Sequence, residues 1–199
     1  MSNQNAALIT PLGGPVLSPE VETFISEQVR LQVAAELKRL GLDPARPKRA
    51  ALIASKGTLD MAYPPLILAT AAAAMDMEAA VFFTFYGLDI VRKKKLHHLK
   101  VPPLANPAMP VPVPNIIGML PGMTYMATWM MKDWMKKGGV PSISDLLDFA
   151  KENGVRLIVC QMSMDVLGIK KEELIDGLEF SGAAAYLDYA ADADITLFV

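Results

Sequence analysis

The segment Val155-Arg-Leu-Ile-Val-Cys160-Gln-Met-Ser-Met-Asp165-Val-Leu-Gly168 joins an apolar run to a polar, turn-prone stretch. The apolar run predicts a buried strand, and it places Cys160, the only cysteine of the chain, at that strand's carboxyl end. In open α/β sheets, ligands and reacting groups collect at this edge. The thiol therefore has two interpretations. It is either a one-cysteine active site or a small buried hydrophobe, because free cysteine is among the most buried residue types.

Short apolar runs alternate with helical patterns from residue 50 onward. We predict strands over 50–55, 79–85, 155–160, 178–180 and 195–199. We predict helices over 59–77, 88–99, 121–137, 142–153, 170–177 and 183–191. Strands separated by helices indicate βαβ units with right-handed crossovers. The sequence thus predicts an α/β fold: a single domain with a mainly parallel, flavodoxin-like sheet.

Two further regions accompany this domain. Residues 1–17 are predicted to form a mobile N-terminus, residues 18–47 a helical arm and linker, and residues 48–199 the α/β domain. A Pro- and Met-rich helical insertion is expected at about 101–139. No charged residue occurs over 101–131, but seven prolines in that stretch exclude a transmembrane helix. We expect the arm and the insertion to form subunit contacts.

The composition excludes several classes of protein. A net charge of −2 argues against a general nucleic-acid binder, whose surface would be basic. One cysteine allows neither an internal disulfide framework nor a thiolate zinc site. Neither candidate loop contains a GxGxxG or Walker motif, so nucleotide binding has no support and we predict no cofactor. Adjacent His97 and His98 point in different directions on a helix and no other histidine exists, so we predict no metal. The N-terminus lacks the pattern of a signal peptide, which predicts a cytoplasmic location.

Three motifs resemble those of the DsrE/DsrF/DsrH-like superfamily, in particular its larger DsrE-type branch labelled peroxiredoxin-like. They are the segment 160–177, the run Phe83-Thr-Phe-Tyr-Gly87-Leu, and Ser55-Lys-Gly57 followed by Asp60. The resemblance spans roughly 49–199. It implies a flavodoxin-like sheet, a homotrimer or hexamer, and transfer of persulfide sulfur through Cys160. It also implies a partner that is a small TusA-like sulfur carrier or a rhodanese-type donor.

The absence of a second cysteine narrows what this resemblance implies. Some relatives carry another cysteine in the insertion, whereas this chain has none, so a two-thiol relay within one chain is excluded. A peroxidase cycle would need a resolving thiol from another molecule. Sulfur transfer needs only one nucleophilic thiolate, which attacks a persulfide and is then attacked in turn.

The candidate site consists of Cys160 as the catalytic residue and the loops expected at the same sheet edge. Amide donors and the start of the following helix would favour the reactive thiolate there. Gly57 and Gly87 would let the backbone approach a ligand, and Lys56 would stabilise an anionic persulfide. The alternative is that both loops are ordinary βα turns. The predicted substrate or anion contacts are Ser55, Lys56, Gly57, Tyr86, Gly87, Gln161 and Ser163.

Two further patterns keep other functions open. Met119, Met123, Met126 and Met130 form a helical stripe that suits Cu(I), although such stripes are more often core or interface. Trp129 and Trp134, among lysines, suit a helix on a membrane surface. The basic run 92–100 is either a solvated face or a surface that steers an acidic carrier or a sulfur anion towards Cys160.

We therefore predict a cytoplasmic sulfur carrier or sulfurtransferase. The alternatives are a non-catalytic oligomeric assembly module with an inert buried cysteine, and a membrane-surface or Cu(I)-associated protein that uses the Met-rich helix.

Overall fold

The computed structural model describes residues 18–40, 46–102 and 122–199, in two units, Met1–Arg46 and Pro47–Val199. In the first unit, helix α1 (Pro19–Arg39) begins with proline at its first position and acidic residues in its first turn, and none of its residues is buried. The predicted mobile N-terminus, most of the linker and residues 103–121 of the predicted insertion lie outside the described residues.

Five parallel strands form one sheet in the second unit, in the order β4-β3-β2-β1-β5. The strands are β1 (Arg49–Ala54), β2 (Glu78–Phe83), β3 (Arg156–Cys160), β4 (Glu179–Ser181) and β5 (Ile195–Phe198). The three inner strands are almost continuously apolar because a parallel sheet is covered on both faces. All four residues of the edge strand β5 are exposed. The predicted α/β class with a parallel sheet is confirmed.

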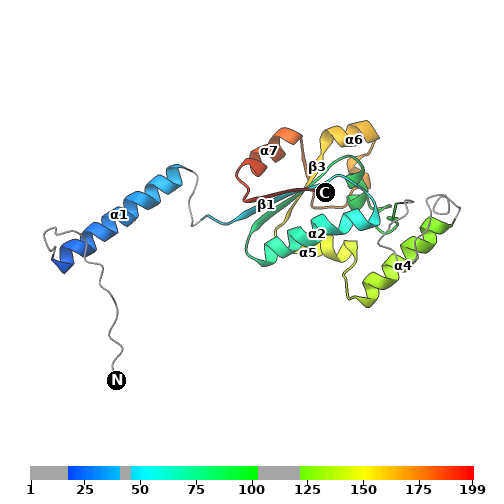
Figure 1. Ribbon diagram of the computed structural model, residues 1–199. Coiled ribbons are helices and arrows are strands. Elements are labelled where there is room, and N and C mark those ends of the chain that lie inside the picture. Colours follow the sequence, from blue (N-terminus) through cyan, green and yellow to red (C-terminus); the bar gives the residue numbers. More distant parts are fainter. Residues whose placement is uncertain (1–17, 41–45, 103–121) are drawn as a thin grey trace, which may run out of the picture. The chain divides into compact units, whose positions relative to one another are not determined.

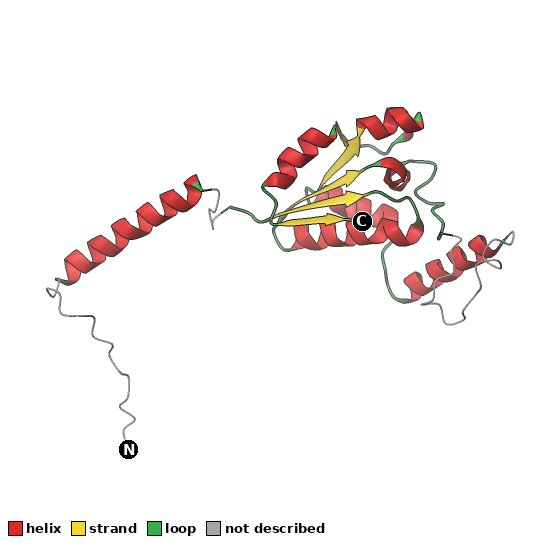
Figure 2. Cartoon of the chain, turned by 45° about the horizontal axis from the view of Figure 1, so that its top comes forward, coloured by secondary structure: helices red, strands yellow, loops and turns green. Residues whose placement is uncertain are grey.

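Helices cover both faces of this sheet (Figures 1 and 2). Helices α2 (Leu59–Ala74) and α5 (Ile143–Glu152) pack on one face, whereas α7 (Ala183–Ala191) packs on the other. Alternate residues of the same strands supply the two cores, since successive side chains of a strand point to opposite faces. On the α7 side, the rings of Phe82 and Tyr186 stack with their centroids 4.7 Å apart.

The predicted α-helix over 88–99 is wrong. The chain instead forms a short 3-10 helix, η1 (Phe85–Val91), followed by turns. Tertiary pairing explains the difference: Arg92 forms an antiparallel bridge with Leu174, and the Ile175 amide donates to the Val91 carbonyl at 3.0 Å. In a helix, the backbone N–H and C=O groups would form hydrogen bonds within the segment. Here some of them bond instead to a segment more than eighty residues away in the sequence.

The prediction for the region after Cys160 also needs correction. The stretch expected to be turn-prone forms helix α6 (Gln161–Leu167), which ends at Gly168 with φ 62°. The helix expected over 170–177 is reduced to one 3-10 turn, η2 (Lys171–Glu173). The remaining helix, α4 (Met123–Lys137), lies within the predicted insertion. In the described ranges, no helix is long and apolar enough to cross a membrane.

Candidate functional site

Cys160 is the last residue of β3 and the residue that precedes the first turn of α6, as the strand prediction required. Its side chain belongs to the apolar cluster on the α7 face of the sheet, together with Phe82, Ile158 and Tyr186. Only 2% of the residue is exposed. A reaction at its sulfur therefore requires the surrounding side chains to move, because the chain by itself covers the thiol.

Hydroxyl groups gather beside this cysteine at the carboxyl edge of the sheet. Phe83 of β2 pairs with Val159 of β3, so Thr84 and Cys160 each directly follow the last pair of that ladder. The Thr84 Oγ1 and Ser163 Oγ atoms lie 3.0 Å apart, and Ser163 is fully buried. Sequence reasoning did not name Thr84 as a site residue, although Thr84 belongs to the Phe83-Thr-Phe-Tyr-Gly87-Leu motif that carried the family resemblance.

The two loops expected at this edge lie against each other. A Cβ atom on Gly57 would be 2.3 Å from the Tyr86 carbonyl oxygen, and one on Gly87 would be 2.0 Å from the Ala54 carbonyl oxygen. These glycines therefore allow a close approach to other backbone segments of the same chain. Contact of either glycine with a ligand stays a prediction.

The other predicted contact residues differ in exposure. Ser55 is half-buried, and its hydroxyl donates to the Val199 carbonyl at 2.8 Å. Lys56, Tyr86 and Gln161 are exposed, whereas Ser163 is buried. Of these contact residues the structure thus buries Ser163, and it leaves the one predicted cation, Lys56, at the surface.

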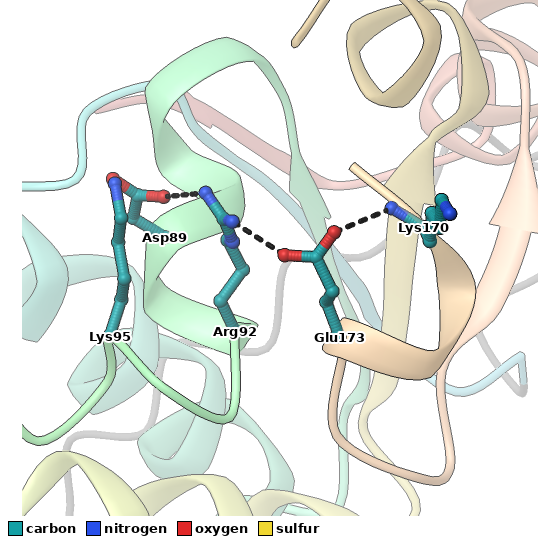
Figure 3. A network of polar contacts seen from close by, with 5 residues as sticks. All are labelled: Asp89, Arg92, Lys95, Lys170 and Glu173. Carbon is teal, nitrogen blue, oxygen red and sulfur yellow. Dashed lines mark hydrogen bonds and ion pairs between the residues drawn. The ribbon is translucent and has the colours of Figure 1, made fainter. Parts of the chain in front are cut away.

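A polar network connects η1 with the segment that follows α6 (Figure 3). Arg92 donates to Asp89 at 3.3 Å and to Glu173 at 2.6 Å, and Glu173 also accepts from the Lys170 amide at 3.1 Å. The Lys170 amide and the Arg92 guanidinium lower the pKa of Glu173. The same Glu173 bond raises the pKa of Arg92. This network fixes the chain that leaves α6.

The same contacts change the interpretation of the basic run. Lys95 pairs with Asp89 at 2.8 Å, and Lys93 lies 3.5 Å from Asp176. Lys100 donates to the Tyr125 hydroxyl at 2.9 Å. Several of the cations are therefore bound to neighbours within the chain, which reduces the net positive field that the sequence suggested.

The other two patterns are only partly described. Met126 is exposed, Met123 and Met130 are half-buried, and Met119 lies outside the described residues. Trp129 and Trp134 are exposed on α4. Across the described ranges, no group of three or more His, Cys, Asp or Glu side chains is arranged to hold a metal ion.

Comparisons with known proteins found one family model and several similar proteins. A model of the DsrE/DsrF/DrsH-like family matches residues 46–198. The sulfur carrier protein DsrE2 of Allochromatium vinosum is 48% identical over 158 residues, covering 76% of this chain and 98% of that protein. The uncharacterized protein YrkE of Bacillus subtilis is 34% identical over 162 residues, covering 76% of this chain and 97% of that protein.

A solved structure was also matched. The ychN protein of E. coli superposes with a TM-score of 0.46 at 15% sequence identity, covering 77% of this chain and 100% of that one.

Proposed function

Because the chain belongs to the DsrE/DsrF/DrsH-like family, we propose that it carries sulfur in a relay and that Cys160 holds this sulfur as a persulfide. The observation that carries the proposal is the 48% identity, over 98% of its length, to a protein named as a sulfur carrier. The position of Cys160, the one cysteine, at the carboxyl end of β3 supports it, since this is where parallel sheets place reacting groups.

The transfer needs no net oxidation. The Cys160 thiolate attacks the outer sulfur of a donor persulfide, so that a new S–S bond forms while the donor's S–S bond breaks and the donor leaves as a thiolate. An acceptor thiolate then attacks the outer sulfur on Cys160 and releases the Cys160 thiolate. With one cysteine in the chain, both partners are other molecules. We propose a rhodanese-type donor or a TusA-like carrier for these roles.

The hydroxyl pair beside Cys160 suits this chemistry. Each hydroxyl has one proton, and the bond between Thr84 and Ser163 uses only one of the two. We propose that the other proton is donated to a sulfur anion on Cys160. Anion contacts from Ser55, Lys56, Gly57, Tyr86, Gly87 and Gln161 belong to the same proposal.

Mass spectrometry of the intact protein tests the proposal. After incubation with polysulfide or a persulfidated carrier protein, we expect the native chain to gain about 32 Da, the mass of one sulfur atom. The gain should disappear on reduction, and Cys160→Ser should not show it. A native chain without the adduct, or a Cys160→Ser chain that gains it equally, contradicts the proposal.

The second candidate function is an assembly module with an inert cysteine, and the 2% exposure of Cys160 favours it. The two functions differ in the rate of sulfur uptake. If polysulfide modifies Cys160 only as fast as the chain unfolds globally, the cysteine is part of the core and the assembly function is correct. Uptake faster than global unfolding, measured by hydrogen exchange under the same conditions, supports the carrier.

We also propose a cytoplasmic homotrimer or hexamer. Exposed apolar residues on α1 and α4, among them Phe24, Val29 and Trp129, would supply subunit contacts. A membrane surface is the competing partner for α4, because Trp129 and Trp134 are exposed among lysines. Co-sedimentation with anionic liposomes separates the two.

A further inference from the structure

A cavity of about 530 Å³ lies between α2, α4 and α5, and none of the residues predicted to serve Cys160 lines it. Four segments bound it: the start of α2, the turn after η1, the C-terminal half of α4, and the residues that lead into α5. Its volume is within the range of small-molecule sites, which is about 300–1,000 Å³.

The floor of the cavity is apolar. Leu59, Leu96 and Ile143 line it and are themselves buried, and Met135 and Val140 pack against the same core. A ligand that enters would remove apolar surface from water on both sides of the contact. This floor favours a ligand with an apolar body over a small inorganic ion.

The rim of the cavity is cationic. His97, Lys132 and Lys136 line it, and no acidic side chain is among its described lining residues. Lys132 donates to the His97 carbonyl at 3.0 Å, which holds α4 against the turn after η1. Lys136 has no carboxylate partner in the part of the chain that the structure describes, whereas the adjacent Lys137 pairs with Asp133 at 2.6 Å. The two lysines therefore attract a negative charge to the rim, and the Asp145 carboxylate near Tyr63 partly opposes that attraction.

A tyrosine adds a polar group to the site. Tyr63 lines the cavity and is 8% exposed. Burial, together with the charge of Asp145, raises the pKa of Tyr63 above its ordinary value. The Ser142 and Ser144 hydroxyls, 2.9 Å apart, also line the cavity.

We propose that this cavity binds a small organic acid with an apolar body, whose anionic head lies at Lys136 and Lys132 and accepts a hydrogen bond from Tyr63. The apolar floor would contact the apolar body of such a molecule, and Lys136, which has no carboxylate partner among the described residues, would pair with its anionic head. The site is separate from the chemistry proposed for Cys160, so either proposal can fail alone.

Calorimetric titration of the full chain with sodium decanoate, below its micelle concentration, tests the proposal. We expect saturable one-to-one binding with a Kd below about 1 mM. The neutral analogue decanol should bind at least about tenfold more weakly, because it leaves the cations unpaired. Lys136→Gln and Tyr63→Phe should each weaken decanoate binding by about three- to tenfold. Lys137→Gln, one residue away on α4, is the matched control and should bind as the native chain does.

Three results overturn the proposal: no saturable decanoate binding, decanol binding as tight as decanoate, or Lys137→Gln weakening binding as much as Lys136→Gln. Competition by sodium sulfate as effective as competition by octanoate would also overturn it, since the floor would then contribute nothing. Circular dichroism of each variant shows whether it is folded. If Tyr63→Phe is misfolded, the test depends on the comparison of decanoate binding by the two surface variants, Lys136→Gln and Lys137→Gln.

Discussion

Gly87 is a position where the chain has no room for a side chain. A Cβ atom there would lie 2.0 Å from the Ala54 oxygen and 2.7 Å from its carbonyl carbon, both backbone atoms at the end of β1. Backbone at the centre of a parallel sheet cannot move aside cheaply. The glycine in the Thr84-Phe-Tyr-Gly87 motif is therefore required by packing between two loops.

We predict that Gly87→Ala lowers the free energy of unfolding by about 3 kcal/mol, the upper end of the usual cost of overpacking. Gly182→Ala is the matched control, because a Cβ there would have no neighbour within 4 Å. Its cost should stay below about 1 kcal/mol, that of losing a glycine before a helix. Urea denaturation of both variants measures the difference, and equal costs would show that the space at Gly87 is not limiting.

At the scale of elements, the Arg92–Glu173 pair joins η1 to the turn after α6. The Glu173 carboxylate also accepts a hydrogen bond from the Lys170 amide. Together, the bonds from Arg92 and Lys170 hold the pKa of Glu173 below its ordinary value of 4.5. A carboxyl group with a lowered pKa in the folded state stabilises the fold above its unfolded pKa. That contribution is lost as the pH falls through the lower, folded value.

We therefore predict that Glu173→Gln lowers the melting temperature at pH 7 and that the difference from the native chain shrinks as the pH falls below 4.5. Glu172→Gln, which removes the adjacent exposed carboxylate, should change little at either pH. Thermal unfolding followed by circular dichroism from pH 7 to pH 3 measures both. A Glu173→Gln effect that is independent of pH would show that charge is not its cause.

Comparison of the elements shows where the sequence was sufficient. Helix α7 has the predicted bounds, and each predicted strand lies within about two residues of the observed one. Besides the stretch that forms α6, the predictions failed at 88–99 and 170–177, the two segments that bond to each other through Arg92 and Glu173. Each of these segments has a helical pattern of its own. Pairing between the two segments replaced the hydrogen bonds of the predicted helices, and the pattern within either segment cannot predict that pairing.

At the scale of the whole molecule, the chain divides after Arg46, and the helix of the first unit has no buried residue. Its exposed apolar residues are the basis of our proposal that it contacts a second copy of the chain. The second unit has its own two-sided core, so it should fold without the first.

We predict that a chain starting at Pro47 keeps the urea midpoint of the full chain but forms a smaller assembly. Light scattering coupled to size exclusion measures the mass, and the full-length double variant Phe24→Gln, Val29→Gln is the control that removes apolar surface while keeping the helix. An unchanged mass for both would refute the role of α1 in assembly. A lower midpoint for the truncated chain would refute the independence of the second unit.

Local periodicity and general rules of chain connection were sufficient to predict the α/β class, the parallel strands, and the place of Cys160 at a strand end. The strand order, the burial of Cys160 to 2% exposure, the contact of Thr84 with the predicted residue Ser163, and the cavity beneath α4 became known only from the folded chain. Each of these depends on contacts between segments far apart in the chain. Such contacts are set by how whole helices and strands pack, and periodicity within a segment carries no information about them.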